Sequence, residues 1–350
     1  MVAVLAPRPS AASTGAVPAA DAGGDAGGDA WLAAAFAPEA LGAAFQFVRV
    51  LGRGGMGTVV LARERGLHRA VALKLLHSEF AGSPRGVERF RREARIQAQL
   101  EHPGVVPLYA MGEATVAGAR VPYLVMRYVP GESLADRLAQ RGPIDAADAA
   151  RLLAELAAVL AYAHGQGVVH RDLKPGNVLL ERTAAGPGGE PREPGERAVL
   201  TDFGVAARPT HDDPRTADHG AGTPHYMAPE QVAGEHAVDG RTDLYALGAL
   251  GLAMLTGRRP FADHATAAVA VAHLAAPVPD VAALAPTAPP ALCAALARCL
   301  AKDPAARWQS AGAFAAAIAG HAPGARTPAW HRWRRRARAL VERVARRAPR

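Results

Sequence analysis

The sequence predicts an α+β protein in two unequal lobes, a small lobe rich in β-strands followed by a larger lobe made mainly of helices. Segments with strand-forming residues crowd the chain from residue 45 to 129, whereas helical patterns prevail from residue 130 to 320. The two parts meet at a turn near Val129 and Gly131. With 350 residues, of which 50% are hydrophobic, the chain is long enough to form both lobes.

In the small lobe, three consecutive segments have the composition of strands: FQFVRVL, GTVVLARE and AVALKLL. The turn residues Gly54-Gly55 and Arg65-Gly66 separate them, which predicts an antiparallel meander. The segment GVERFRREARIQAQL then predicts one helix, which ends at His102-Pro103. Two more strands are expected around residues 105–111 and 121–128.

In the large lobe, helices are expected at 133–140 and 147–165. Loops and short strands follow from residue 168 to 230, and helices dominate again from 242 to 319. Residues 181–197, ERTAAGPGGEPREPGER, are rich in Gly, Pro and charge, so we expect a mobile surface insertion there.

Both ends of the chain differ from the lobes in composition. Residues 1–44 are mostly Ala, Gly, Asp and Pro and are expected to be disordered, although WLAAAFAPEALGAAF could form a short helix that rests on the body. Residues 321–350 carry ten Arg and one Glu, so the net charge of +8 belongs to this tail and the body is near neutral. The body therefore lacks a general nucleic-acid signature, and no specific nucleic acid is expected as a partner.

Cysteine usage and hydropathy point to the cytoplasm. Cys293 and Cys299 are too few for a disulfide framework and do not share a face of the expected helix. No apolar run reaches the roughly 18 residues needed to span a bilayer, and no secretory signal is evident. We expect a cytoplasmic protein without a transmembrane helix, with peripheral attachment to the inner face of the membrane as an alternative.

The segment LGRGGMGTVV contains the spacing Gly52-x-Gly54-x-x-Gly57. Such turns let backbone amides approach phosphate oxygens, because no side chain intervenes. The same spacing occurs in dinucleotide-binding folds, in protein kinases and in ordinary tight hairpins. A dinucleotide fingerprint needs a helix after its glycines, whereas TVVLA after Gly57 predicts a second strand. The dinucleotide reading is therefore excluded, and the glycines alone leave the other two open.

Five further motifs follow in order: VALK with Lys74, RFRREA with Glu93, HRDLKPGN at 170–177, TDFG with Asp202, and GTPHYMAPE at 222–230. Together with the glycines, this set resembles the signature of the eukaryotic-type (Hanks-type) protein kinases over residues 46 to 320. GGMGTV, HPGVVPLY and APEQ are most similar to the serine/threonine kinases of bacteria. The resemblance implies the bilobal protein kinase fold, ATP and Mg²⁺ as cofactors, with Mn²⁺ as an alternative metal, and transfer of the γ-phosphoryl group to protein Ser/Thr hydroxyls.

Phosphoryl transfer depends on positioning and charge neutralisation more than on covalent chemistry. The resemblance implies that Lys74 binds the α- and β-phosphates and that Glu93 orients it. Asp172 would accept the proton of the substrate hydroxyl, and Lys174 would stabilise the transferring phosphate. Asn177 and Asp202 would hold the metal, because oxygen donors suit a hard cation that binds mainly through phosphates.

The nucleotide would lie between the two lobes. Met126 falls at the family's gatekeeper position, and backbone atoms of Arg127 and Val129 would contact adenine; Arg127 stands where an acidic residue is more usual. Apolar side chains would sandwich the ring, which is also what ordinary core packing would produce. The residues implied to contact nucleotide are Leu51, Gly52, Arg53, Gly54, Gly55, Met56, Gly57, Val59, Ala72, Lys74, Met126, Arg127, Val129 and Leu179.

The resemblance gives other motif residues a supporting role. His170 would pack beside Phe203, which precedes Gly204, and Arg171 would await a phosphate on the activation segment. Glu230 would pair with Arg307, and Asp243 would hold the backbone of the catalytic loop.

The activation segment contains three threonines. Thr216 is the first choice for autophosphorylation and Thr210 the second, because a phosphate there could pair with Arg171 and order the segment. Thr223 fits the substrate-binding shelf, where it would contact Asp172 and Lys174.

The tail AWHRWRRRARALVERVARRAPR places apolar residues on one helical face and arginines on the rest. This pattern is typical of an interfacial helix on an anionic membrane, but contact with another polyanion, docking on the kinase body or a solvated helix stay open. Protein substrates are the expected partners, and a homodimer through the kinase domain is an open alternative. The main rival function is an ATP-binding pseudokinase scaffold; the complete set of Lys74, Glu93, Asp172, Asn177 and Asp202 favours an active enzyme.

Overall fold

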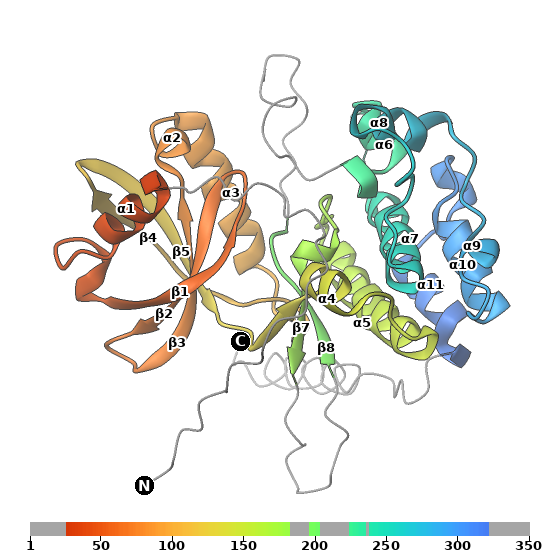
Figure 1. Ribbon diagram of the computed structural model, residues 1–350, viewed down its shortest axis with the longest axis horizontal. Coiled ribbons are helices and arrows are strands. Elements are labelled where there is room, and N and C mark those ends of the chain that lie inside the picture. The colour runs from red at the N-terminus through yellow and green to blue at the C-terminus, as the bar shows by residue number, and fades with distance from the viewer. Residues whose placement is uncertain (1–25, 183–195, 204–223, 236–237, 322–350) are drawn as a thin grey trace, which may run out of the picture.

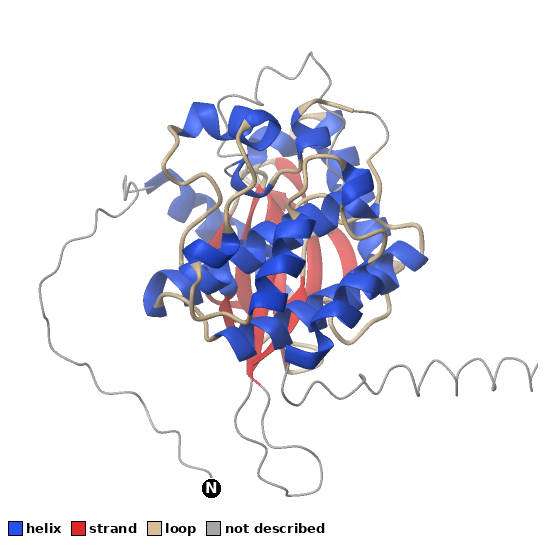
Figure 2. Ribbon diagram, turned by 90° about the vertical axis from the view of Figure 1, so that its right-hand side faces the viewer, coloured by secondary structure: helices blue, strands red, loops and turns tan. Residues whose placement is uncertain are grey.

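The computed structural model describes residues 26–182, 196–203, 224–235 and 238–321. Figure 1 shows the two expected lobes, with the strand-rich small lobe on the left and the mainly helical large lobe on the right. In Figure 2, viewed from the side of the large lobe, its helices lie in front of the strands. No helix among the described residues is both long and apolar enough to cross a membrane.

The small lobe is built on a five-stranded antiparallel sheet in the order β1-β2-β3-β5-β4. The expected meander forms its first three strands, which the glycine-rich turn and a second turn connect. The last two strands lie a few residues from their expected ranges. The strands are β1 Phe45–Arg53, β2 Gly57–Glu64, β3 Arg69–Leu76, β4 Leu108–Val116 and β5 Ala119–Arg127.

Both faces of this sheet are covered. Val71, Leu73 and Leu75 of β3 are buried in a cluster on one face, which we call the outer face, while the alternate residues Ala72 and Leu76 are buried on the other, the inner face. This alternation follows from the two-residue period of a strand. The inner face packs against helix α3 (Pro84–Ala98), which lies between the sheet and the large lobe (Figure 1). Helix α2 (Ser78–Ala81) leads into α3.

The outer face is covered by residues that we expected to be disordered. Helix α1 (Ala26–Ala35) and the 3₁₀ turn η1 (Leu41–Ala43) precede β1, and Leu32, Ala35 and Leu41 are buried against the sheet. The folded part of the chain therefore begins before residue 45, and the short helix that the sequence allowed starts at Ala26. Burial of apolar side chains on the outer face explains why an Ala-rich segment is held in place.

Helices α5 (Ala146–Gly165) and α7 (Gly240–Thr256) lie at the centre of the large lobe. Their apolar residues contribute much of its main core cluster. Asp145 and Asp239 cap their N-termini by accepting hydrogen bonds from backbone amides. Cys293 and Cys299 are free and buried in this core. The other helices are α4 Leu134–Arg141, α6 Pro229–Val232, α8 Thr266–Ala275, α9 Val281–Leu284, α10 Pro290–Cys299 and α11 Ala311–Ile318.

A second, three-stranded sheet lies at the junction of the lobes. Its strands are β6 Gly131–Ser133, β7 Val178–Arg182 and β8 Glu196–Leu200, paired in that order. The insertion expected at 181–197 is shorter. Its first two residues belong to β7 and its last two to β8, and they pair with each other. Residues 183–195 lie outside the described part of the chain. The backbone of Leu200 bonds to Val106 N and Gly104 O, which ties β8 to the segment after α3.

Candidate active site

Lys74 joins the two lobes at the inner face of the sheet. Its Nζ donates to Glu93 Oε1 of α3 at 2.6 Å and to Asp202 Oδ1 of the large lobe at 2.8 Å. Burial alone would lower the pKa of Lys74, but the carboxylates of Asp202 and Glu93 outweigh burial and raise it. The same contact keeps the pKa of Asp202 below its ordinary value, although burial acts in the opposite direction. The site thus holds a permanently charged ammonium between two carboxylates.

The segment after α5 gathers three more polar side chains. Lys174 Nζ donates to Asp172 Oδ2 at 2.9 Å, and Asn177 Nδ2 donates to Asp172 O at 2.8 Å and to Oδ2 at 3.1 Å. Among the described residues, nothing donates to Oδ1 of Asp172, and this side chain is 46% exposed. One carboxylate oxygen is therefore fixed and the other is open to a substrate proton.

Asp243, in α7, holds the backbone of this segment. Its carboxylate accepts from the amides of His170 and Arg171, each at 2.8 Å, and its Oδ2 also bonds to His164 Nε2. Arg171 and Asp202 have φ angles of 66° and 54°, a conformation that costs energy for residues other than Gly. Both residues belong to the segments that carry the expected catalytic groups, so packing holds the backbone there in an unusual shape.

The rings of His170 and Phe203 lie 4.7 Å apart, and His170 Nε2 bonds to the carbonyl oxygen of Thr201 at 3.2 Å. Both rings are buried, with exposures of 0% and 1%. They connect the segment that carries Asp172 to the one that carries Asp202, so the two potential metal ligands Asn177 and Asp202 are held by adjoining, well-packed segments. Their amide and carboxylate oxygens are suitable donors for Mg²⁺.

In the glycine-rich turn between β1 and β2, most of the glycines have free space where a side chain would stand. A Cβ added to Gly52 or Gly55 would meet no described atom within 4 Å, and one added to Gly54 would meet only Gly57 O at 3.6 Å. Gly57 differs, because a Cβ there would come within 2.3 Å of Leu75 O on β3. Packing in the described structure therefore requires glycine at Gly57 alone, and the other three leave room for a ligand to approach the backbone.

Apolar residues from both lobes share one cluster below this turn. Ala72, Met126 and Val129 are buried, and Leu51, Met56, Val59 and Leu179 pack against them half-buried. Lys74 lies on the same face of β3 as Ala72. An apolar surface next to fixed charges suits a ligand with a ring at one end and phosphates at the other.

Arg127, which departs from the family pattern, makes a contact that the sequence did not indicate. Its Nη1 donates to Glu181 Oε1 at 2.6 Å, and Arg197 Nη2 donates to Glu181 Oε2 at 2.6 Å. These two arginines lower the pKa of Glu181, although its partial burial acts in the opposite direction. The side chain of Arg127 thus points to the three-stranded sheet. Glu181 and Arg197 could not be identified from the sequence, because their Gly- and Pro-rich surroundings indicated a loop.

Glu230 and Arg307 form a bidentate ion pair, with two N–O distances of 2.8 Å. Arg307 is fully buried and also donates to the carbonyl oxygens of Ala301, Arg241 and Lys302. Two further contacts were not expected from the sequence. Thr242 Oγ1 donates to Glu230 Oε1 at 2.6 Å. Gln231, the last residue of APEQ, donates to the carbonyl oxygen of Arg171 at 2.8 Å.

Several expected site residues lie outside the described part of the chain. These are Gly204, Thr210, Thr216 and Thr223. Arg53 belongs to β1, which leads into the glycine-rich turn.

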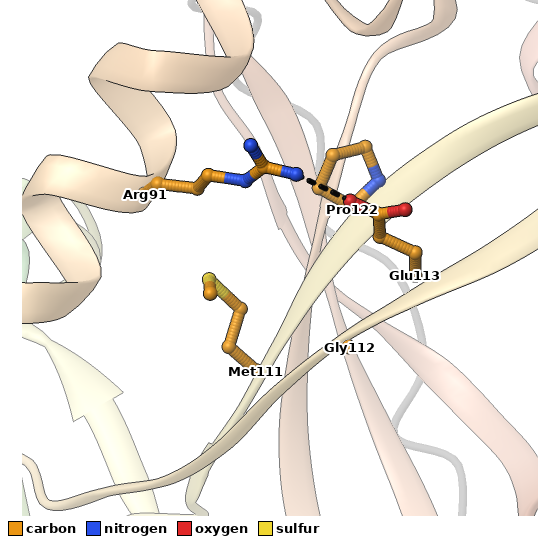
Figure 3. Close-up of a pocket in the computed structure, with 5 residues that line it drawn as sticks. All are labelled: Arg91, Met111, Gly112, Glu113 and Pro122. Carbon is orange, nitrogen blue, oxygen red and sulfur yellow. Dashed lines mark hydrogen bonds and ion pairs between the residues drawn. The ribbon is translucent and has the colours of Figure 1, made fainter.

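A hollow of about 190 Å³ lies between α3 and the strands β4 and β5 (Figure 3). Arg91 and Glu113, which line it, form an ion pair of 2.6 Å, and Met111 lies beside them. Arg91 and Glu93 are two residues apart on α3 and so lie on nearly opposite faces. This hollow therefore does not open to Lys74, and the chemistry lies elsewhere.

The protein kinase domain family matches residues 45–318. The chain belongs to this family. It is 37% identical over 285 residues to the serine/threonine-protein kinase PknA of Mycobacterium tuberculosis, covering 81% of this chain and 62% of that protein. It is 41% identical over 291 residues to PknJ of the same species, covering 82% and 47%. It is 33% identical over 267 residues to PrkC of Bacillus subtilis, covering 76% and 39%.

Among solved structures, the crystal structure of the kinase domain of M. tuberculosis PknI is similar, with a TM-score of 0.59 and 30% sequence identity. The likeness covers 80% of this chain and 97% of that domain. The chain thus has the bilobal protein kinase fold that its motifs implied. It spans 62% or less of the length of the curated relatives described above.

Proposed function

We propose that this chain is an ATP- and Mg²⁺-dependent serine/threonine protein kinase. The observation that carries the proposal is the completeness of the site: Lys74 with two carboxylate partners faces a segment in which Asp172 has one oxygen fixed and one open. The similarity to bacterial kinases named for serine and threonine supports the choice of acceptor.

In this mechanism Lys74 binds the α- and β-phosphates of ATP, and Glu93 keeps the ammonium oriented. Oδ1 of Asp172 accepts the proton of the acceptor hydroxyl as the hydroxyl oxygen attacks the γ-phosphorus, while the bond from that phosphorus to the bridging oxygen breaks and ADP leaves. Such a base typically contributes ~10²- to 10⁴-fold to the rate. Lys174, already next to Asp172, neutralises charge on the transferring group. Mg²⁺ held by Asn177 and Asp202, or Mn²⁺ in its place, would neutralise the phosphate oxygens.

Nucleotide specificity would come from the cleft. Leu51, Val59, Ala72 and Leu179 would enclose the adenine ring, and backbone atoms of Arg127 and Val129 would bond its edge. Since Arg127 uses its side chain to reach Glu181, the substitution at this position leaves the backbone available to the nucleotide. Amides of the glycine-rich turn would cover the β- and γ-phosphates.

Phosphate transfer from γ-labelled ATP tests the proposal. The full chain should label itself and a generic protein on Ser and Thr when Mg²⁺ is present, and the chelator EDTA should abolish labelling. Asp172→Asn is the matched control, because the amide keeps the shape but cannot accept the proton. If wild-type protein binds ATP and transfers no phosphate, the chain is a pseudokinase scaffold instead.

Autophosphorylation is proposed at Thr216 first and Thr210 second, with Arg171 as the phosphate's partner and Thr223 on the substrate shelf. Mass spectrometry after incubation with ATP and Mg²⁺ tests this, and finding no phosphate on the activation segment would contradict it. For the basic tail we propose contact with an anionic membrane surface. Sedimentation with anionic liposomes, with and without residues 325–350, tests it; equal recovery would contradict it.

A further inference from the structure

Helix α1 is a part of the small lobe that the family match does not include. The matched residues begin at 45, whereas α1 ends at Ala35 and is followed by the turn η1. Leu32, Ala35 and Leu41 are only 6%, 0% and 2% exposed and belong to the same cluster as Phe45. In Figure 1, α1 lies at the side of the sheet away from the large lobe. The layer on the outer face of the sheet thus lies outside the residues that match the family.

This layer reaches the root of the glycine-rich turn. In β2, Thr58 lies on the same face as Val60, which is buried in the outer cluster. His77 comes two residues after Leu75, just past the end of β3, and so continues the same face of that strand. The ring of Trp31, from α1, meets the ring of His77 edge-on, with centroids 6.2 Å apart and planes at 87°. This is a favourable geometry for two aromatic rings.

His77 in turn holds the chain on both sides of Gly57. Its backbone amide donates to the carbonyl oxygen of Met56 at 3.0 Å, and its Nε2 shares a hydrogen bond of 3.0 Å with Thr58 Oγ1. Thr58 is 2% exposed and His77 is half-buried, so loss of this bond would leave the Thr58 hydroxyl shielded from water and without this partner. Gly57 itself lies against Leu75 O. The start of β2 is therefore held by His77 in addition to its pairing with β1 and β3, and α1 contacts the ring of this histidine.

We propose that α1 is a positioning element for the glycine-rich turn, acting through Trp31, His77 and Thr58. Trp31 holds the imidazole in the orientation that bonds Thr58, and this bond sets the direction in which β2 leaves the turn. The amide of Gly54 already donates to Gly57 O at 2.9 Å, so the amides left to meet phosphate oxygens are those at the tip of the turn, at Gly55 and Met56. Because these amides must point at the phosphates, a shift at the root of the turn weakens nucleotide binding. The inference rests on the proposed function in assigning ATP to this turn, and it makes ATP affinity depend on residues outside the matched kinase domain.

The test measures binding of ATP with Mg²⁺ to the full chain by calorimetry, alongside thermal unfolding of the same samples. Trp31→Ala should raise the dissociation constant about threefold to tenfold, the range expected from losing an aromatic contact. Trp31→Phe, which keeps a ring, should stay near wild type. Ala33→Ser changes an exposed residue of α1 and serves as the control. Calorimetric stoichiometry reports the folded fraction separately from affinity.

Coupling between the residues distinguishes positioning from general stability. Thr58→Val removes the hydroxyl but keeps the shape, and should itself weaken ATP binding. In that background, Trp31→Ala should have little further effect on affinity, because the relay is already broken. A lower unfolding temperature with ATP affinity within about twofold of wild type would overturn the inference, as would fully multiplicative effects in the double variant. Wild-type protein that binds no ATP would overturn the proposed function and this inference together.

Discussion

Two buried ion pairs, Lys74–Glu93 and Arg307–Glu230, differ in how completely their charges are satisfied. Arg307 is 0% exposed, and each of its nitrogens donates to an acceptor in the protein. Lys74 has a side chain 13% exposed and makes one contact with each of two carboxylates on different lobes. The Arg307–Glu230 pair is thus saturated, whereas Lys74 is the more exposed of the two cations, as the proposed contact with a phosphate oxygen requires. The number of hydrogen-bond partners around each cation therefore distinguishes a structural ion pair from one that is available to a ligand.

The saturated pair should matter most for stability. Arg307→Leu leaves Glu230 buried without its counter-charge, and breaking such a pair costs about 3–5 kcal/mol. The free energy of unfolding, measured with denaturant, should fall by this amount. Glu230→Gln retains a hydrogen-bond acceptor for Arg307 but removes the counter-charge of this buried guanidinium, so it should also be strongly destabilising. A loss below 1 kcal/mol for Arg307→Leu would contradict the interpretation of this pair as structural.

The open pair should matter most for activity. Lys74→Met removes the ammonium that meets the phosphates, so phosphoryl transfer should fall by about 10²- to 10³-fold, as on removal of a preorganised donor. Unfolding in denaturant provides the control, and the loss of stability should be smaller than for Arg307→Leu. The comparison fails if Lys74→Met unfolds the protein or leaves the transfer rate unchanged.

A buried histidine supplies a third, pH-dependent contrast. Burial, with help from Lys302, lowers the pKa of His273 from 6.5 to about 4. His273 is 0% exposed, and its Nδ1 bonds to Tyr245 OH at 2.8 Å. The unfolded chain therefore takes up this proton first as pH falls below 6.5, and stability should decrease down to pH 4 by about 3 kcal/mol from this group.

Denaturant unfolding between pH 7.5 and 4.5, a range chosen around the roughly 6.5 pKa of free histidine, measures this effect. His273→Leu should lose stability more slowly than wild type as the pH falls, because it lacks the titrating group. Equal slopes for the two proteins would show that His273 takes up its proton at the same pH in the folded and unfolded states, and would contradict the lowered pKa.

The smallest effect is expected in the glycine-rich turn. Gly54 has no positive φ and an added Cβ finds space, so Gly54→Val should leave stability nearly unchanged while it weakens ATP binding about tenfold by blocking the phosphates. Gly57→Ala is the matched contrast, because its Cβ would collide with Leu75 O and should lower stability. Equal losses of stability in the two variants would contradict the assignment of this space to a ligand.

The sequence was most informative where chemistry restricts residue choice. Lys74, Glu93, Asp172 and Asp202 could be named from motifs because their order along the chain is distinctive. Lys74 does contact Glu93 and Asp202, and the segment of Asp172 packs against that of Asp202 through His170 and Phe203. The sequence could not show that α1 covers the outer face of the sheet. This packing requires only apolar side chains, and every Ala-rich segment of the chain has them. One signal was present: AVALKLL is apolar at alternate and intervening positions, as in a strand covered on both faces.

The charged residues at the lobe junction could not be predicted from the sequence. Glu181 and Arg197 stand in a Gly- and Pro-rich sequence that is typical of a loop, yet they pair across β7 and β8 and reach Arg127. Their partner lies 54 positions away from Glu181, so local composition carries no trace of it. Tertiary contacts of this kind become visible only once the two lobes are folded.

The measurement that tests the central claim most directly is the single-turnover rate of γ-phosphoryl transfer to a protein acceptor in Asp172→Asn, with ATP affinity measured on the same samples. Since the amide cannot accept the hydroxyl proton, the rate should fall by at least about 10²-fold. ATP affinity should stay within about twofold of wild type, because Lys74 and the glycine-rich turn are intact. An unchanged rate with unchanged affinity would contradict the assignment of Asp172 and, with it, the proposed mechanism.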